Sequence, residues 1–97
     1  MLLPEVVTLV NARAVRDAAI SALSALAAGA KLAVDASKLR KFDSGLLTVL
    51  LELQRGAKLR GVQVLLSGAT DEVRERLAKL AQAYGMTDTV KGMLPAA

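Results

Sequence analysis

The stretch that decides the fold is Lys31–Gly61, KLAVDASKLRKFDSGLLTVLLELQRGAKLRG. Its first residues, Lys31–Asp35, are an apolar run closed by a carboxylate, which predicts a short buried strand. After a polar loop, Asp43 or Ser44 stands where a helix N-cap is expected, because short polar side chains satisfy the free N–H groups of a first turn. Gly61 follows where a glycine commonly ends a helix. The stretch therefore predicts a strand, a polar loop and a long helix.

The helix predicted from residue 44 to about residue 60 has an apolar face and a polar face. Apolar residues recur along one side at helical spacing, which predicts burial. The positions expected to face inward are Leu46, Leu47, Val49, Leu50, Leu53, Ala57 and Leu59. The positions expected to face outward are Thr48, Glu52, Arg55 and Lys58. We therefore expect this helix to cover a core and to expose a polar stripe.

The chain before this stretch predicts one strand and one helix. Residues 5–10 (EVVTLV) are short and β-branched, as in a strand. Asn11 suits the N-cap of a helix, because apolar residues recur at helical spacing from residue 12 to about residue 28. Gly29 stands at the expected end of that helix.

The chain after this stretch predicts another strand and another helix. Residues 62–67 (VQVLLS) form the strand, Thr70 suits the N-cap of the helix, and Gly85 its end. The apolar stripe of this helix is Val73, Leu77, Leu80, Ala81 and Tyr84. Residues 89–94 predict a further short strand or helix.

Alternating strands and helices predict an α/β fold. Strands separated by helices pair mostly in parallel, because each crossover returns the chain to the same end of the sheet. With so few strands, we expect a small, mostly parallel sheet with helices mainly on one face. The length of 97 residues fits a single domain over residues 1–97.

The composition excludes several classes of site. The chain contains no cysteine and no histidine, which excludes disulfides, Cys/His zinc sites and Ser-His-Asp triads within it. Hydrophobic residues make up 54% and aromatic residues 2%, so the core is built from Leu, Val and Ala. Few aromatic side chains are left for stacking on bases or sugars.

The charge and the N-terminus bear on partners and location. The formal net charge of +4 comes from residues scattered over several elements, as on an ordinary solvated surface. The other reading is a basic face for an acidic protein partner or an anionic membrane. The N-terminus lacks the pattern of a signal peptide, and no apolar run approaches the roughly 20 residues that span a bilayer. These features predict a cytoplasmic protein.

The polar loop allows three kinds of chemistry. Asp35 and Asp43 lie at its ends and could pair in a metal site or in a phosphate-directed enzyme, although each also fits an ordinary loop or capping role. Lys41–Gly45 offers a helix N-terminus near cations but lacks the spacing of a nucleotide-binding loop. Ser44 is either a simple cap or a hydroxyl that a partner contacts, and phosphate there would reverse the local charge.

Three runs of this chain resemble the STAS domain. They are Val34–Leu39 (VDASKL), Phe42–Leu50 (FDSGLLTVL) and Arg60–Val64 (RGVQV). The family contains anti-sigma-factor antagonists and regulatory modules of transporters. The resemblance implies a STAS-like α/β fold and a binding module without catalytic residues, metal or cofactor. The small size and the Met93–Pro95 tail are most similar to STAS subunits of ABC transporters that maintain phospholipid asymmetry in the outer membrane.

The resemblance also implies a protein partner and the surface that binds it. In the transporter branch the partner is the ATPase subunit, which connects the domain indirectly to membrane permease subunits at the inner membrane. Neither nucleic acid nor direct membrane insertion is implied. The implied partner-binding residues are Asp43, Ser44, Gly45, Thr48, Glu52 and Arg55. In the alternative, an anti-sigma-factor antagonist, Ser44 matches the phosphoacceptor.

Three departures from the family pattern stand out. Gly45 and Leu46 replace residues that are usually Ser or Ala and Gly or Ala. We expect the bulky Leu46 to alter how closely a partner approaches. Ala36 replaces a common Leu at the end of the strand. The N-terminus is too short for the family's first hairpin, which predicts a reduced sheet of three or four strands.

Overall fold

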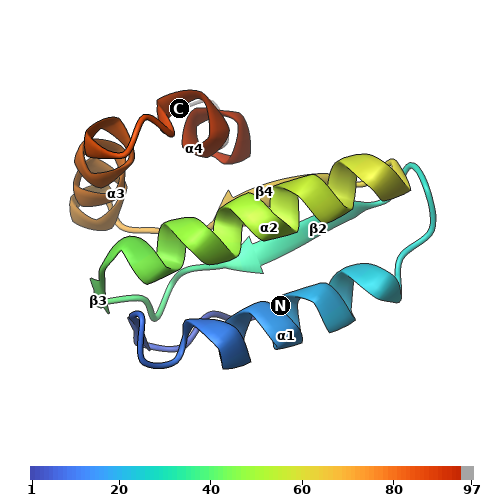
Figure 1. Ribbon diagram of the computed structural model, residues 1–97, viewed down its shortest axis with the longest axis horizontal. Helices are drawn as coiled ribbons and strands as arrows, with labels where there is room; N and C mark the ends of the chain where they lie inside the picture. Colours follow the sequence, from blue (N-terminus) through green and yellow to red (C-terminus); the bar gives the residue numbers. More distant parts are fainter. Residues whose placement is uncertain (95–97) are drawn as a thin grey trace.

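The structure is a computed structural model that describes residues 1–94 (Figure 1). Its elements in chain order are β1 (Val6–Val7), α1 (Ala12–Ser24), β2 (Lys31–Asp35), β3 (Lys41–Phe42), α2 (Ser44–Arg60), β4 (Gln63–Ser67), α3 (Asp71–Ala83) and α4 (Thr87–Met93). Figure 1 shows α2 lying across β2 and β4, with α1 on one side of α2 and with α3 and α4 on the other. The long helix therefore lies at the centre of the helical layer.

The strands form two parallel pairs, as the sequence predicts. β2 pairs with β4 from Lys31 opposite Gln63 to Asp35 opposite Ser67. β1 pairs with β3 over two residues. Because the connections between β2 and β4 pass through α2, the parallel pairing agrees with a helical crossover.

The N-terminal segment joins the two pairs. The N–H of Leu3 donates to the carbonyl of Asp35 at 2.9 Å, and the N–H of Asp35 donates to the carbonyl of Met1 at 2.7 Å. Pro4 has no N–H to donate, and beyond it the chain pairs with β3 through β1. Residues 1–7 thus act as one edge strand in two pieces.

The helices cover one face of the sheet. Side chains alternate along each strand, so that Leu32 and Val34 of β2 and Val64 and Leu66 of β4 are buried. Lys31, on the opposite face of β2, is exposed. The expectation of an α/β fold with helices mainly on one face is confirmed.

The inner face of α2 supplies much of the core. The buried residues of this helix are Gly45, Leu46, Leu47, Val49, Leu50, Leu53 and Ala57. α1 approaches closely at Gly56, where an added Cβ would lie 3.1 Å from Leu23. Gly61 ends α2 in the left-handed conformation, with φ of 70°. The predicted bounds and inward positions of α2 hold, except that Leu59 is 90% exposed.

The first predicted strand is shorter than residues 5–10. Only Val6–Val7 pair, and residues 8–10 form a turn. The side chain of Asn11 accepts the N–H of Thr8 at 2.8 Å and donates to the carbonyl of Val6 at 2.7 Å. Asn11 is the N-cap residue of α1, as predicted, but its side chain makes no capping hydrogen bond and stabilises this turn instead.

Other boundaries also differ from the sequence expectations. α1 ends at Ser24, before residue 28, and the guanidinium of Arg60 donates to the carbonyl of Ser24 at 3.0 Å. A cation at the last carbonyls of a helix replaces the expected glycine there. The loop predicted between β2 and α2 contains the short strand β3. Tyr84, expected in the apolar stripe of α3, is 59% exposed.

The C-terminal residues add a short helix, α4, where the sequence allowed a strand or a helix. Val90 and Met93 are buried and attach α4 to the core. Pro95, part of the tail compared with the family, lies outside the described residues.

Candidate functional site

Asp43 is the N-cap of α2, which settles the choice between Asp43 and Ser44. Its Oδ1 accepts the N–H of Gly45 at 2.7 Å, and its Oδ2 accepts the N–H of Leu9 at 3.3 Å. One carboxylate therefore caps the helix and fixes the loop before α1. No other acidic residue lies in the first turn of α2.

Ser44, the first residue of α2, keeps its hydroxyl available. The side chain is half-buried, and within residues 1–94 its Oγ makes no hydrogen bond. Only its carbonyl is used, accepting from the hydroxyl of Thr48 at 3.3 Å. Because Asp43 does the capping, the hydroxyl of Ser44 can bond to a partner or be modified without disturbing the cap.

Gly45 has a structural reason to be glycine. A Cβ at this position would lie 2.6 Å from the carbonyl carbon of Thr8 and 2.7 Å from the nitrogen of Leu9. Since both are backbone atoms, neither can move aside cheaply. Gly45 is buried, so it serves the predicted partner surface by letting the loop of residues 8–11 pack against the start of α2.

Leu46 points into the core. It has no exposed surface, and it belongs to the same cluster of buried residues as Leu50 and Leu53. Leu46 therefore offers no surface of its own to a partner, and the expectation that it alters how closely a partner approaches stays a prediction.

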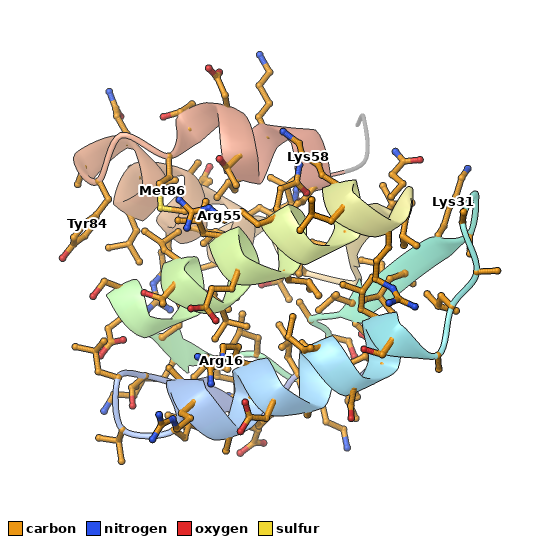
Figure 2. All side chains as sticks on the ribbon, turned by 45° about the vertical axis from the view of Figure 1, so that its right-hand side comes forward. Arg16, Lys31, Arg55, Lys58, Tyr84 and Met86 are labelled. Carbon is orange, nitrogen blue, oxygen red and sulfur yellow. The ribbon has the colours of Figure 1, made fainter. Side chains whose placement is uncertain are left out.

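The predicted stripe Ser44, Thr48, Glu52 and Arg55 lies on the outer side of α2. Spacings of four, four and three residues place these side chains on one face. Thr48 and Arg55 are exposed. Figure 2 shows Arg55 and Lys58 on the side of α2 that faces away from α1, and it shows Arg16 on α1. The structure thus brings together the four predicted side chains along one helix.

Glu52 is engaged by a residue that sequence reasoning missed. Its carboxylate lies 3.3 Å from Nε of Arg16 on α1, and Arg16 also contacts Asp17 at 3.1 Å. The hydrogen bond to Asp17 and then the charge of Glu52 raise the pKa of the Arg16 guanidinium. The sequence does contain a basic residue in α1 and an acidic residue in α2, but only the packing of α1 against α2 brings the two side chains together.

The two aspartates considered for catalysis have separate local roles. Oδ1 of Asp35 accepts the N–H of Ser37 at 2.9 Å, and this bond lowers the pKa of the Asp35 carboxyl. Asp43 caps α2. Among residues 1–94 no group of three acidic side chains is arranged to hold a metal ion. Both carboxylates therefore stabilise loops by accepting backbone N–H groups.

A crevice of about 600 Å³ opens at the carboxyl ends of β2 and β4. Its cations are Lys38, Arg40 and Arg76. Arg76 is already used, because it donates to the carbonyl of Arg40 at 3.0 Å and its guanidinium lies 5.0 Å from the ring centre of Phe42. Two acidic side chains also line the crevice, so its lining carries both positive and negative charges.

The start of α2 follows the short strand β3, has an aspartate cap beside a serine whose hydroxyl is unpaired, and begins a polar helix face. A family model described as Mlab, STAS domain, matches residues 3–95. The chain belongs to the MlaB-type STAS domain family. The match includes every element of the structure and all the predicted site residues. Among curated proteins, none matches this chain.

Proposed function

We propose that this STAS domain is a non-catalytic subunit that binds the ATPase subunit of an ABC transporter for phospholipids and supports its activity. The family supports a regulatory or scaffolding role, since its matched model is of the MlaB type. Among the described residues no helix is long and apolar enough to cross a membrane. In this proposal the domain acts on the cytoplasmic side and reaches the inner membrane and its permease subunits through the ATPase.

The observation that carries the proposal is the free hydroxyl of Ser44. A serine at a helix start is ordinarily its cap, but here Asp43 takes that role with Oδ1, while its Oδ2 accepts the N–H of Leu9. The hydroxyl stands half-exposed at the positive end of α2, at the head of the stripe formed with Thr48 and Arg55. Such a group is suited to bond across an interface.

Binding of the purified ATPase subunit to wild-type protein and to Ser44→Glu tests this proposal. A charge buried without a partner is costly, so we expect Ser44→Glu to weaken binding by about 2 kcal/mol or more, about 30-fold in Kd. Calorimetric titration measures the affinity directly. Thr87→Glu is the matched control, because Thr87 is an exposed hydroxyl residue at the first position of α4.

Normal binding of Ser44→Glu would show that Ser44 lies outside the interface. Absence of binding by the wild-type protein would contradict the assignment to the transporter. The ATPase rate, measured with and without the domain, separates a subunit that only binds from one that supports turnover.

The same hydroxyl favours a second candidate, an anti-sigma-factor antagonist switched by phosphorylation of Ser44. Phosphate added there would meet the positive end of α2, so the helix would tolerate it, while the charge would repel a partner at close range. Incubation with the cognate serine kinase and ATP, followed by mass spectrometry, tests this candidate. Phosphate on Ser44, absent in Ser44→Ala, would support the antagonist.

A further inference from the structure

The turn before α1 presents two large apolar side chains to solvent beside the start of α2. Leu9 is 68% exposed and Val10 is 96% exposed. Figure 1 shows this turn, in dark blue, at the same end of the molecule as the first turn of α2. Exposed apolar side chains that gather beside a polar site are typical of protein contact surfaces.

The turn is held in one conformation by its own hydrogen bonds. The N–H of Thr8 donates to the side chain of Asn11 at 2.8 Å, and the N–H of Val10 donates to the hydroxyl of Thr8 at 3.3 Å. The N–H of Leu9 donates to Asp43, the cap of α2, at 3.3 Å. Leu9 and Val10 therefore project from a preorganised backbone, which loses little entropy on binding.

The outer face of α2 is too small to hold a partner alone. Its 17 residues span about 25 Å, and an exposed face about 10 Å wide offers only about 250 Å². A stable interface buries about 800 Å² on each partner. The interface that includes Ser44 must therefore extend over neighbouring elements, and the turn of residues 8–11 adjoins Ser44 directly through Asp43 and Gly45.

The charges around the two apolar side chains indicate the chemistry of the partner surface. Arg13 on α1 lies with Thr48 along one groove between α1 and α2. Arg13 is exposed, and within the part of the chain that the structure describes it forms no ion pair. This unpaired cation stands in the first turn of α1, close after Leu9 and Val10, and favours a protein surface that carries carboxylates.

We propose that Leu9 and Val10 are the apolar anchor of the partner interface and enter an apolar pocket with an acidic rim on the protein that contacts Ser44. This inference deepens the proposed function and rests on it for the identity of that protein. The hydrogen bond from the N–H of Leu9 to Asp43 makes the turn continuous with the proposed contact at Ser44, which favours a protein over a lipid surface as the occupant.

Single variants of the turn, titrated against the purified ATPase subunit, test the anchor. Leu9→Ser and Val10→Ser should each weaken Kd about tenfold or more, as for an interface residue buried at the centre of a contact. Tyr84→Ser is the matched control, since it removes another exposed apolar side chain, from the end of α3, and should change Kd less than twofold. Thermal melting should be unchanged for Val10→Ser, whose side chain has no packing to lose.

The outcomes separate the anchor from the identity of the partner. If the wild type binds the ATPase and both turn variants bind equally well, the anchor is overturned while the proposed function stands. If the wild type binds only the cognate anti-sigma kinase, and the turn variants weaken that binding, the anchor stands and the transporter assignment falls. Binding to neither protein overturns both. Sedimentation of the wild type with anionic phospholipid vesicles that is lost in Val10→Ser, with protein binding unaffected, would replace the anchor with a membrane contact.

Discussion

The starts of α2 and α3 solve the same capping problem in different ways. Thr70 caps α3 with its own hydroxyl, accepting the N–H of Val73 at 3.2 Å, and Asp71 and Glu72 follow in the first turn. α2 is capped by the carboxylate of Asp43, and no acidic residue follows. The start of α3 is complete within itself. At the start of α2 the carboxylate of Asp43 supplies the negative charge that suits the helix dipole, and the hydroxyl of Ser44 stays free.

The difference is the basis of the partner surface proposed at the start of α2. At α3 the hydroxyl of Thr70 is already used as the cap of the helix that follows it. At α2 the cap also ties down the turn of residues 8–11, so that Ser44 stands between a fixed apolar turn and a polar helix face. A partner meeting this surface finds groups already in place, which reduces the entropy lost on binding.

Gly45→Ala, at the start of α2, should have the largest effect on stability. The added Cβ would lie within 2.8 Å of three backbone atoms of Thr8 and Leu9, so the turn must move and unfolding should become easier by about 3 kcal/mol. Glu72→Ala, at the second position of α3, should change stability by about 0.5 kcal/mol or less. Urea titration of both variants measures the difference, and equal stabilities would mean that the turn is not packed against α2.

Removing the two caps sharpens the comparison. Thr70→Ala loses one hydrogen bond and should destabilise the protein by about 1 kcal/mol. Asp43→Ala loses that bond and the bond to Leu9 as well, so we expect about 2 kcal/mol. Hydrogen exchange at the N–H of Leu9 should accelerate in Asp43→Ala and stay unchanged in Thr70→Ala. Acceleration in both variants would mean that Asp43 has no special hold on the turn.

Acidification gives the smallest expected effect and tests the loop that follows Asp35. The N–H of Ser37 lowers the pKa of Asp35 below its ordinary value of 3.8, so the stabilisation is present above that value and is lost as pH falls through the lowered pKa. We expect the stability of the wild type to fall below about pH 4, and that of Asp35→Asn to fall less. Denaturant midpoints at a series of pH values measure this, and parallel curves would exclude a contribution from Asp35.

The regular elements of the fold were predictable because their signals are local. β2 and α2 were found at the predicted residues, since an apolar run, a capping aspartate or serine, and a closing glycine each act within a few residues. The failures occur where distant residues decide. Where α1 ends early, Arg60 from α2 donates to the carbonyl of Ser24, and where the first strand stops, Asn11 donates back to the carbonyl of Val6.

The candidate site was predictable in position and less so in composition. The spacing along α2 placed Thr48 and Arg55 on its outer side, as the structure has them. The turn carrying Leu9 and Val10 was read as strand, because β-branched and apolar residues favour strands when no contact is known. The partner-binding role predicted for Thr48 and Arg55, like that of Asp43, Ser44, Gly45 and Glu52, stays a prediction until an affinity is measured.

The sequence by itself determined the alternation of strands and helices, the inner face of α2, and the membership of the MlaB-type STAS domain family. Only the tertiary structure decided that Asp43 caps the helix and that Ser44 is left free. Both residues are good caps by local chemistry. The choice fell to Asp43 because a carboxylate has two oxygens, and the folded chain brings the N–H of Leu9, 34 residues away, to the second one.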